Sequence, residues 1–302
     1  MDQNSYVLGE SSLEGAFCAQ EAQAMMLGGK RVDIVFSLSM ILLCTTTWWN
    51  RPALVAQQGL LSGIAAPEAA RLRQSFLPLV SRAPICQPIP DAAYTTLPPF
   101  SAPSDRPAEA HPDLNLSIRG YDLTDAARIL VDYSSPGPGV TAPQLSDLFG
   151  SHRLPVFRSV YRVYDWDWGR MQRGALLFWP SVTALGMQTS TGEILYVPDS
   201  GYDIGSGCEV LVLYASTDRI TLKYTREDNV VYGYTLHVEQ LCVEPSLVSL
   251  YQECNRKGRR TLPALRPRQA FGRSRGSEVI IAIRDTGAFM DPRARGDWWL
   301  GY

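Results

Sequence analysis

The chain has 302 residues, 45% of them hydrophobic and 19% charged, with a formal net charge of −2. This length is ample for the core of one or two domains. The near-neutral charge gives no general attraction to nucleic acid, which we exclude as a partner. Six cysteines are too few for a fold built on disulfides. The three histidines, His111, His152 and His237, are too few for a site that needs several imidazoles.

The N-terminal part is expected to precede the folded domain. Residues 1–29 are small and polar and predict a flexible tail. In residues 30–50, Lys30 and Arg31 precede an uncharged, mostly apolar stretch over residues 34–49. This stretch is short for a spanning helix and fits a signal sequence or membrane anchor; a buried core helix or strand is the alternative. We therefore expect contact with a membrane and an extracytoplasmic location.

Residues 51–113 are predicted to be a Pro-rich linker with one short helix over 57–76. Nine prolines fall between residues 78 and 112, with few large apolar residues, which is typical of an extended spacer that packs into no core. Four cysteines are candidates for disulfides, and the sequence does not decide which of them pair: Cys86, Cys208, Cys242 and Cys254.

Residues 114–154 are predicted to be a helical and turn-rich lead-in. Leu123, Ala126, Ile129 and Leu130 recur at helical spacing, so a helix is predicted over 123–133. The short apolar stretch 144–149 predicts a single helical turn.

Residues 155–302 are predicted to form a β-rich domain. Its candidate strands are short, rich in β-branched and aromatic residues, and bounded by Gly, Asp, Asn or Pro. They cover 158–168, 174–182, 192–198, 209–216, 219–225, 233–241 and 278–285. One helix is predicted over 245–258, with Pro245 near its start and Gly258 at its end. The fold class is mainly β: an antiparallel β-sandwich or open barrel with one inserted helix.

Three surface features have two interpretations each. Basic residues between 256 and 275 either contact an anionic polymer or, as we favour, form a solvated face. Alternating aromatics at 161, 164, 166 and 168 are either a platform for sugars or one half-buried strand. The pair Trp298 and Trp299 is open to the same two interpretations, a platform for sugars or packing, and aromatic residues near a chain end often dock onto the domain.

Four segments between about residues 195 and 297 follow one another in a familiar order. They are GYDIGSGCEVLVLY, then ITLKY with GYTLHVEQL, then PALRPRQAFGRSRG, and finally SEVIIAIRDTGAFMDPR. In order and spacing they resemble the lysostaphin-like (LytM-type) zinc metallopeptidases. The resemblance implies that family's β fold for this part of the chain.

The same resemblance implies a degenerate metal site. The family's zinc-binding His and Asp correspond to Asp199 and Asp203, its His-x-His strand to Glu278 and Ile280, and its catalytic hairpin His to His237. Zinc favours nitrogen and sulfur donors, so two carboxylates and an isoleucine make a poor zinc site. Calcium could use Asp199, Asp203 and Glu278; we nevertheless expect no cofactor, neither zinc nor calcium.

We therefore expect a non-catalytic, extracytoplasmic cell-envelope protein that serves binding, regulation or scaffolding. Its partner would be peptidoglycan or another envelope protein. Two alternatives stay open: a divergent metal-dependent hydrolase (a metallo-endopeptidase) of peptidoglycan or peptide, with His237 and Glu278 as remnants of its catalytic residues, and a structural surface subunit. The expected ligand groove is lined by Asp199, Tyr202, Asp203, His237, Glu278 and Arg284.

Overall fold

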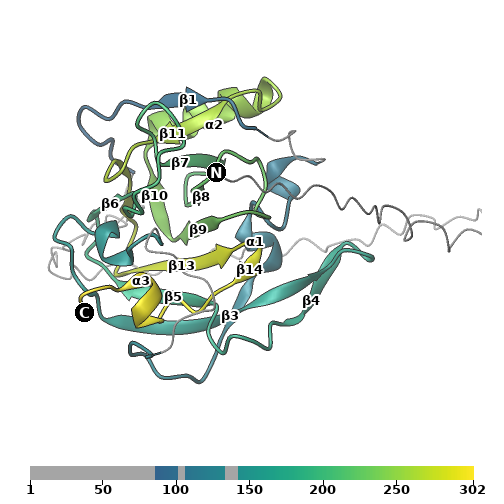
Figure 1. Ribbon diagram of the computed structural model, residues 1–302, viewed down its shortest axis with the longest axis vertical. Coiled ribbons are helices and arrows are strands. Elements are labelled where there is room, and N and C mark those ends of the chain that lie inside the picture. Colours follow the sequence, from purple (N-terminus) through teal and green to yellow (C-terminus); the bar gives the residue numbers. More distant parts are fainter. Residues whose placement is uncertain (1–85, 101–105, 133–141) are drawn as a thin grey trace, which may run out of the picture. The chain divides into compact units, whose positions relative to one another are not determined.

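Antiparallel strands dominate the chain (Figure 1). The structure is a computed structural model that describes residues 86–100, 106–132 and 142–302. The expected tail (1–29), signal or anchor segment (30–50) and short helix (57–76) lie outside these residues. Among the helices that the structure does describe, none is long and apolar enough to cross a bilayer.

Most strands belong to one large sheet, and all of its pairings are antiparallel. In spatial order the strands are β1 (Thr95–Leu97), β11 (Leu262–Leu265), β7 (Val210–Ala215), β8 (Arg219–Lys223), β9 (Tyr234–Glu239), β13 (Glu278–Asp285), β5 (Ala184–Gln188), β3 (Phe157–Asp167) and β2 (Tyr121–Leu123). Two further strands pair outside this path: β14 (Ala288–Phe289) on β13, and β4 (Gln172–Leu176) on β3. The expectation of a mainly β, antiparallel fold is confirmed.

A second, three-stranded sheet has the order β10 (Leu241–Val243), β12 (Ala270–Ser274) and β6 (Ile194–Tyr196). Both sheets contribute to one hydrophobic core: Phe271 and Leu195 of the small sheet belong to the same cluster as Leu236 and Ile281 of the large one. The helical elements are η1 (Ala108–Ala110), α1 (Leu116–Arg119), η2 (Leu145–Leu148), α2 (Pro245–Arg256) and α3 (Arg295–Trp298). The turn predicted at 144–149 is η2.

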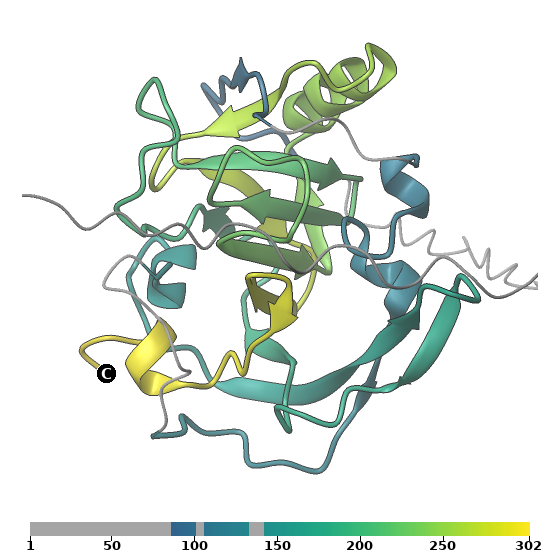
Figure 2. The same cartoon turned by 45° about the vertical axis from the view of Figure 1, so that its right-hand side comes forward.

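The two faces of the large sheet differ in chemistry. On β9, Leu236 and Val238 point into the main core, whereas His237 and Glu239 point to the other face, because successive side chains of a strand alternate. All six residues of β9 are nevertheless buried, since the chain around α1 covers part of the polar face (Figure 2). The covered face of the sheet therefore contains buried ionisable groups, among them His237 and Glu239.

Helix α2 confirms the helix predicted over 245–258. Pro245 occupies its first turn, where a missing N–H costs nothing. The Glu244 carboxylate caps the N-terminus by accepting from the Ser246 N–H at 3.4 Å. Gly258 follows the helix with a φ of +81°, the left-handed conformation that glycine adopts freely.

The prediction of a linker that packs into no core is wrong for its described part. Strand β1 extends the large sheet by pairing with β11, and Leu97 and Ala108 are buried in a hydrophobic cluster. A disulfide joins Cys86 to Cys242, while Cys208 and Cys254 are free. The prolines fit because β1 is an edge strand, beside which proline is tolerated.

The helix predicted over 123–133 is also wrong where the structure describes it. Residues 121–123 form β2, and residues 124–132 have no helical structure. Their backbone groups bond to the C-terminal segment instead: the Ala127 carbonyl accepts from the Arg293 side chain, and the Val131 carbonyl accepts from the Arg295 N–H at 3.0 Å. Ala126 and Leu130 still pack on the core, so tertiary bonds replaced the helix that the spacing predicted.

The C-terminal tryptophans dock onto the domain. Trp298 and Trp299 are fully buried, and their indole N–H groups donate to the carbonyls of Asp291 and Pro292, both at 2.9 Å. Of the two interpretations of this pair, the structure supports the anchoring one.

Candidate ligand-binding site

Asp199 and Asp203 are turn residues. The Asp199 carboxylate accepts from the Gly201 N–H at 3.0 Å, and that of Asp203 accepts from the Gly205 N–H at 2.7 Å. These are local side-chain bonds of the kind that stabilise turns. Tyr202 lies between them and is 36% exposed. The hydrogen bonds within the loop therefore account for the positions of the Asp199 and Asp203 carboxylates.

His237 was expected to line a groove, and the structure buries it instead. Its ring packs on Phe289, and Nδ1 lies 3.0 Å from the Thr221 hydroxyl oxygen. Because that hydroxyl donates to the Leu114 carbonyl at 2.6 Å, Nδ1 of His237 is the donor. Burial, together with the nearby Arg284, lowers the pKa of His237 to about 3. The imidazole is thus a neutral, structural group.

Arg284, the sixth expected groove residue, belongs to a buried ion-pair network. Its guanidinium donates to the Asp113 carboxylate at 2.8 Å, and Arg119 donates to the same oxygen at 2.7 Å. Burial alone would raise the pKa of Asp113, but the two arginines hold it at about 2. The network fastens the chain around α1 onto the polar face of the sheet.

The expected metal ligands are not brought together. Among the residues that the structure describes, no group of three or more His, Cys, Asp or Glu side chains could hold a metal ion. Ile280, which stands where the resemblance places a zinc ligand, has no donor atom. The residues present do not fit a zinc ion.

Glu278, one of the six expected groove residues, lines a pocket. We call this cavity of about 630 Å³ the glutamate pocket. Its lining combines three carboxylates with two guanidinium groups and comprises Tyr121, Asp218, Arg219, Glu239, Gln240, Arg275, Gly276, Ser277 and Glu278. A volume in this range is typical of small-molecule sites.

Two of these carboxylates are neighbours on the sheet. Glu239 of β9 pairs with Ile280 of β13, and Glu278 lies two residues before Ile280 on the same strand face. Diagonal neighbours of this kind have Cα atoms roughly 7–8 Å apart. Both side chains therefore reach the same pocket from adjacent strands.

A tyrosine holds each of the two glutamates. The Tyr121 hydroxyl donates to Oε2 of Glu239 at 2.9 Å, and the Tyr161 hydroxyl donates to Oε1 of Glu278 at 3.3 Å. The tyrosine rings meet edge to face with centroids 5.1 Å apart. Ser159 donates a short hydrogen bond to the same Glu278 oxygen.

Each glutamate keeps one oxygen that is poorly satisfied. Oε1 of Glu239 has no hydrogen-bond partner among the described residues, although Arg219 Nε lies 3.9 Å away. Oε2 of Glu278 has only Arg158 Nε at 4.0 Å. Burial raises the pKa of Glu239, and Arg219 partly opposes that rise. A ligand in the pocket that donates hydrogen bonds would reach Oε2 of Glu278, whereas Oε1 of Glu239 is enclosed and would first have to turn toward the pocket.

Gly186 makes room for this arrangement. It lies on β5 opposite Ile280, and a Cβ atom there would collide with the Glu278 carboxylate and the Ser159 hydroxyl. The Glu278 carboxylate is the flexible end of its side chain, so a methyl group would displace it and leave the sheet in place. Glycine at this position therefore decides where the carboxylate lies.

Glu239 was not among the residues predicted to line a groove, although one signal for it is present in the sequence. In the strand YTLHVE, polar residues occupy every second position, so Glu239 shares a face with His237. Tyr121 and Arg219 carried no comparable signal because they come from β2 and β8, whose positions depend on the tertiary fold.

Comparison of the chain with protein-family models, curated proteins and solved structures gave no match. The function is therefore inferred from the geometry of the site.

Proposed function

We propose that the chain is a non-catalytic, extracytoplasmic cell-envelope protein whose lysostaphin-like domain binds a ligand in the glutamate pocket. The ligand class that we propose is the peptide part of peptidoglycan, or an envelope protein that presents similar groups. Free amino groups beside carboxylates are the chemistry that such peptides offer. The mainly β, antiparallel architecture is the coarse fold class that the resemblance implies.

The observation that carries the proposal is the pair Glu239 and Glu278. Both line one pocket, where three carboxylates stand against two guanidinium groups, and Oε2 of Glu278 lies 4.0 Å from its nearest ion-pair partner. An ammonium group carries three donors and a positive charge, so it matches two such acceptors. Charge-assisted hydrogen bonds are worth about 1.5–3 kcal/mol each, which suffices for selective binding.

The disulfide Cys86–Cys242 supports the proposed location. Disulfides persist in oxidising compartments and are rare in the cytosol. This bond fastens the start of the described chain to strand β10, so the folded domain would depend on an oxidising environment.

The lack of catalysis is proposed from the donor set. His237 is buried and neutral, Ile280 has no donor, and Asp199 and Asp203 bond to their own turns. A catalytic zinc needs three protein ligands and an open position for water.

The test is calorimetric titration of the full chain with N-acetyl-lysyl-alanyl-alanine and with the same peptide acetylated on the lysine amine. We expect the free amine to bind about tenfold or more tightly than the acetylated amine, and Glu239→Gln to remove that preference, the effect of one lost charge-assisted bond. Gly186→Ala should weaken it similarly, because the methyl group displaces the Glu278 carboxylate.

The matched control is Glu253→Gln, an exposed carboxylate on α2 that pairs with Lys257 away from the pocket. It should bind the peptide as the unchanged chain does. Equal binding of the free and acetylated amines would contradict the proposal, and so would cleavage of the peptide during the titration.

A further inference from the structure

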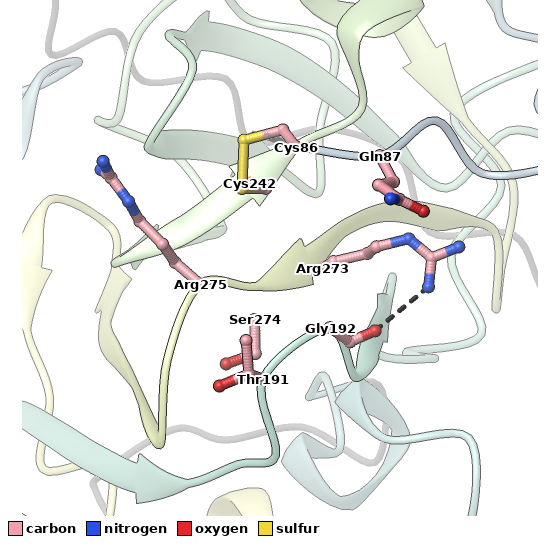
Figure 3. A pocket seen from close by; sticks show the side chains of 8 residues that line it. All are labelled: Cys86, Gln87, Thr191, Gly192, Cys242, Arg273, Ser274 and Arg275. Carbon is pink, nitrogen blue, oxygen red and sulfur yellow. Dashed lines mark hydrogen bonds between the residues drawn. A yellow bond between two sulfur atoms is a disulfide. The ribbon is translucent and has the colours of Figure 1, made fainter. Parts of the chain in front are cut away.

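A second cavity adjoins the glutamate pocket, and we call it the arginine pocket. Its volume is about 300 Å³, at the lower end for small-molecule sites. It is lined by Cys86, Gln87, Thr191, Gly192, Cys242, Arg273, Ser274 and Arg275 (Figure 3). The two cavities share Arg275, and the chain from Arg273 to Glu278 passes along both.

The charges of the two cavities are opposite in character. None of the eight residues lining the arginine pocket is acidic, and two of them are arginines. The glutamate pocket contains three carboxylates against two guanidinium groups. A ligand that lies across both cavities therefore meets acceptors at one end and cationic donors at the other.

The arginine pocket has one anchored and one unanchored arginine. Arg273 is fixed by a bond from Nη1 to the Gly192 carbonyl at 3.1 Å, and its Nε is enclosed without a hydrogen-bond partner among the described residues, out of reach of a ligand. Within the same part of the chain, the Arg275 side chain makes no ion pair or hydrogen bond. Figure 3 shows the two arginines on either side of the Cys86–Cys242 disulfide, with the hydroxyl groups of Thr191 and Ser274 nearby.

These observations decide the chemistry of the second group. Guanidinium forks bind carboxylates with paired N–H donors, and they bind best where water is partly excluded. The Gly192 carbonyl holds the Arg273 side chain in place, whereas Arg275 is exposed and lines both cavities. The shared Arg275 lies where the two cavities meet, so a ligand that spans both passes its guanidinium group.

We propose that the arginine pocket is a carboxylate subsite and that the two cavities bind one zwitterionic peptide. Its ammonium lies at Glu239 and Glu278, and its carboxylate lies at Arg275 with Arg273 behind it. The inference rests on the proposed function for the amine end only, since the carboxylate subsite stands on the arginine pocket by itself.

The experiment uses a probe without an amine, N-acetyl-alanyl-alanine, and its C-terminal amide. Each is titrated into the isotope-labelled full chain while the amide signals of Thr191, Gly192 and Ser274 and the Nε–H signal of Arg273 are followed by NMR. We expect the free carboxylate to shift these signals and to bind about tenfold more tightly than the amide, the effect of one charged hydrogen bond.

Two variants locate the effect. Arg275→Gln should abolish the preference for the carboxylate. Because this side chain is exposed, we expect the variant to fold, and unchanged NMR signals of distant residues would show that it does. Arg266→Gln, an exposed arginine that lines neither pocket, should retain the full preference.

Equal affinity for carboxylate and amide would overturn the subsite, as would shifts spread over exposed arginines with none at the arginine pocket. Either result leaves the amine test of the glutamate pocket intact. Conversely, binding of the carboxylate probe together with equal binding of the free and acetylated lysyl amines would refute the proposed function and keep the subsite.

Discussion

Glu209 makes the stability of this fold depend on pH. The side chain is fully buried at the start of β7, where Oε1 accepts from the N–H and the hydroxyl of Ser200, both at 2.5 Å. Oε2 has no partner among the described residues. Burial raises the pKa of Glu209 from 4.5 to about 7, and the bonds from Ser200 only partly oppose that rise. Ionising this carboxyl in the folded chain is therefore costly.

The direction follows from the number of bound protons. Between pH 4.5 and about 7 the folded chain keeps the Glu209 proton, whereas the unfolded chain has lost it. The free energy of unfolding therefore falls as the pH rises through this window. The stabilisation that comes from the protonated Glu209 side chain is fully present only below pH 4.5. At about 1.4 kcal/mol per pH unit, the loss amounts to about 3 kcal/mol.

The assay compares urea unfolding of the full chain and of Glu209→Gln by tryptophan fluorescence at about pH 5 and about pH 8. The amide cannot ionise, so the variant should gain about 3 kcal/mol on the unchanged chain between these pH values. A constant cost for the unpaired amide N–H cancels in this comparison. Asp125→Asn, an exposed carboxylate, is the control and should show no such gain. A gain below about 1 kcal/mol for Glu209→Gln would refute the reasoning.

Two further outcomes are expected. Asp228→Asn should destabilise the fold by about 3–5 kcal/mol in urea unfolding, because it leaves the buried Arg259 guanidinium without its charged partner. The control is the exposed pair of Asp167 and Arg170, where Asp167→Asn should cost less than about 1 kcal/mol. Elemental analysis of the purified chain should find no stoichiometric zinc, and treatment with a chelator should leave peptide binding unchanged; one zinc per chain, lost in Asp203→Ala, would favour the metal-dependent hydrolase.

Local sequence patterns predicted those elements whose stability is itself local. Helix α2 carries its own start and stop signals, so Pro245 and Gly258 located it. Strands β7, β8, β9 and β13 were predicted from β-branched and aromatic runs between turn residues, and they form where expected. In each case the backbone hydrogen bonds are made within the segment or with neighbours of the same pattern.

Prediction failed where bonds to distant segments decided the backbone. The run from Leu123 to Leu130 has helical spacing, but Arg293 and Arg295 bind its carbonyls and hold it extended. The Pro-rich composition near β1 predicted a spacer, yet an edge strand accepts prolines beside it. Neither outcome can be derived from the local residues, because the deciding partner lies more than a hundred residues away.

For the site, the sequence by itself determined which side chains are available: few histidines, no complete set of zinc ligands, and Glu278 as a polar residue at the start of a strand. Only the tertiary structure decided which groups meet. The register of β9 and β13 placed Glu239 beside Glu278, and the covering chain buried His237 and Arg284 while leaving the two glutamates at a pocket. The physical reason is that alternation assigns a side chain to a face, whereas pairing register and packing decide whether that face is open to a ligand.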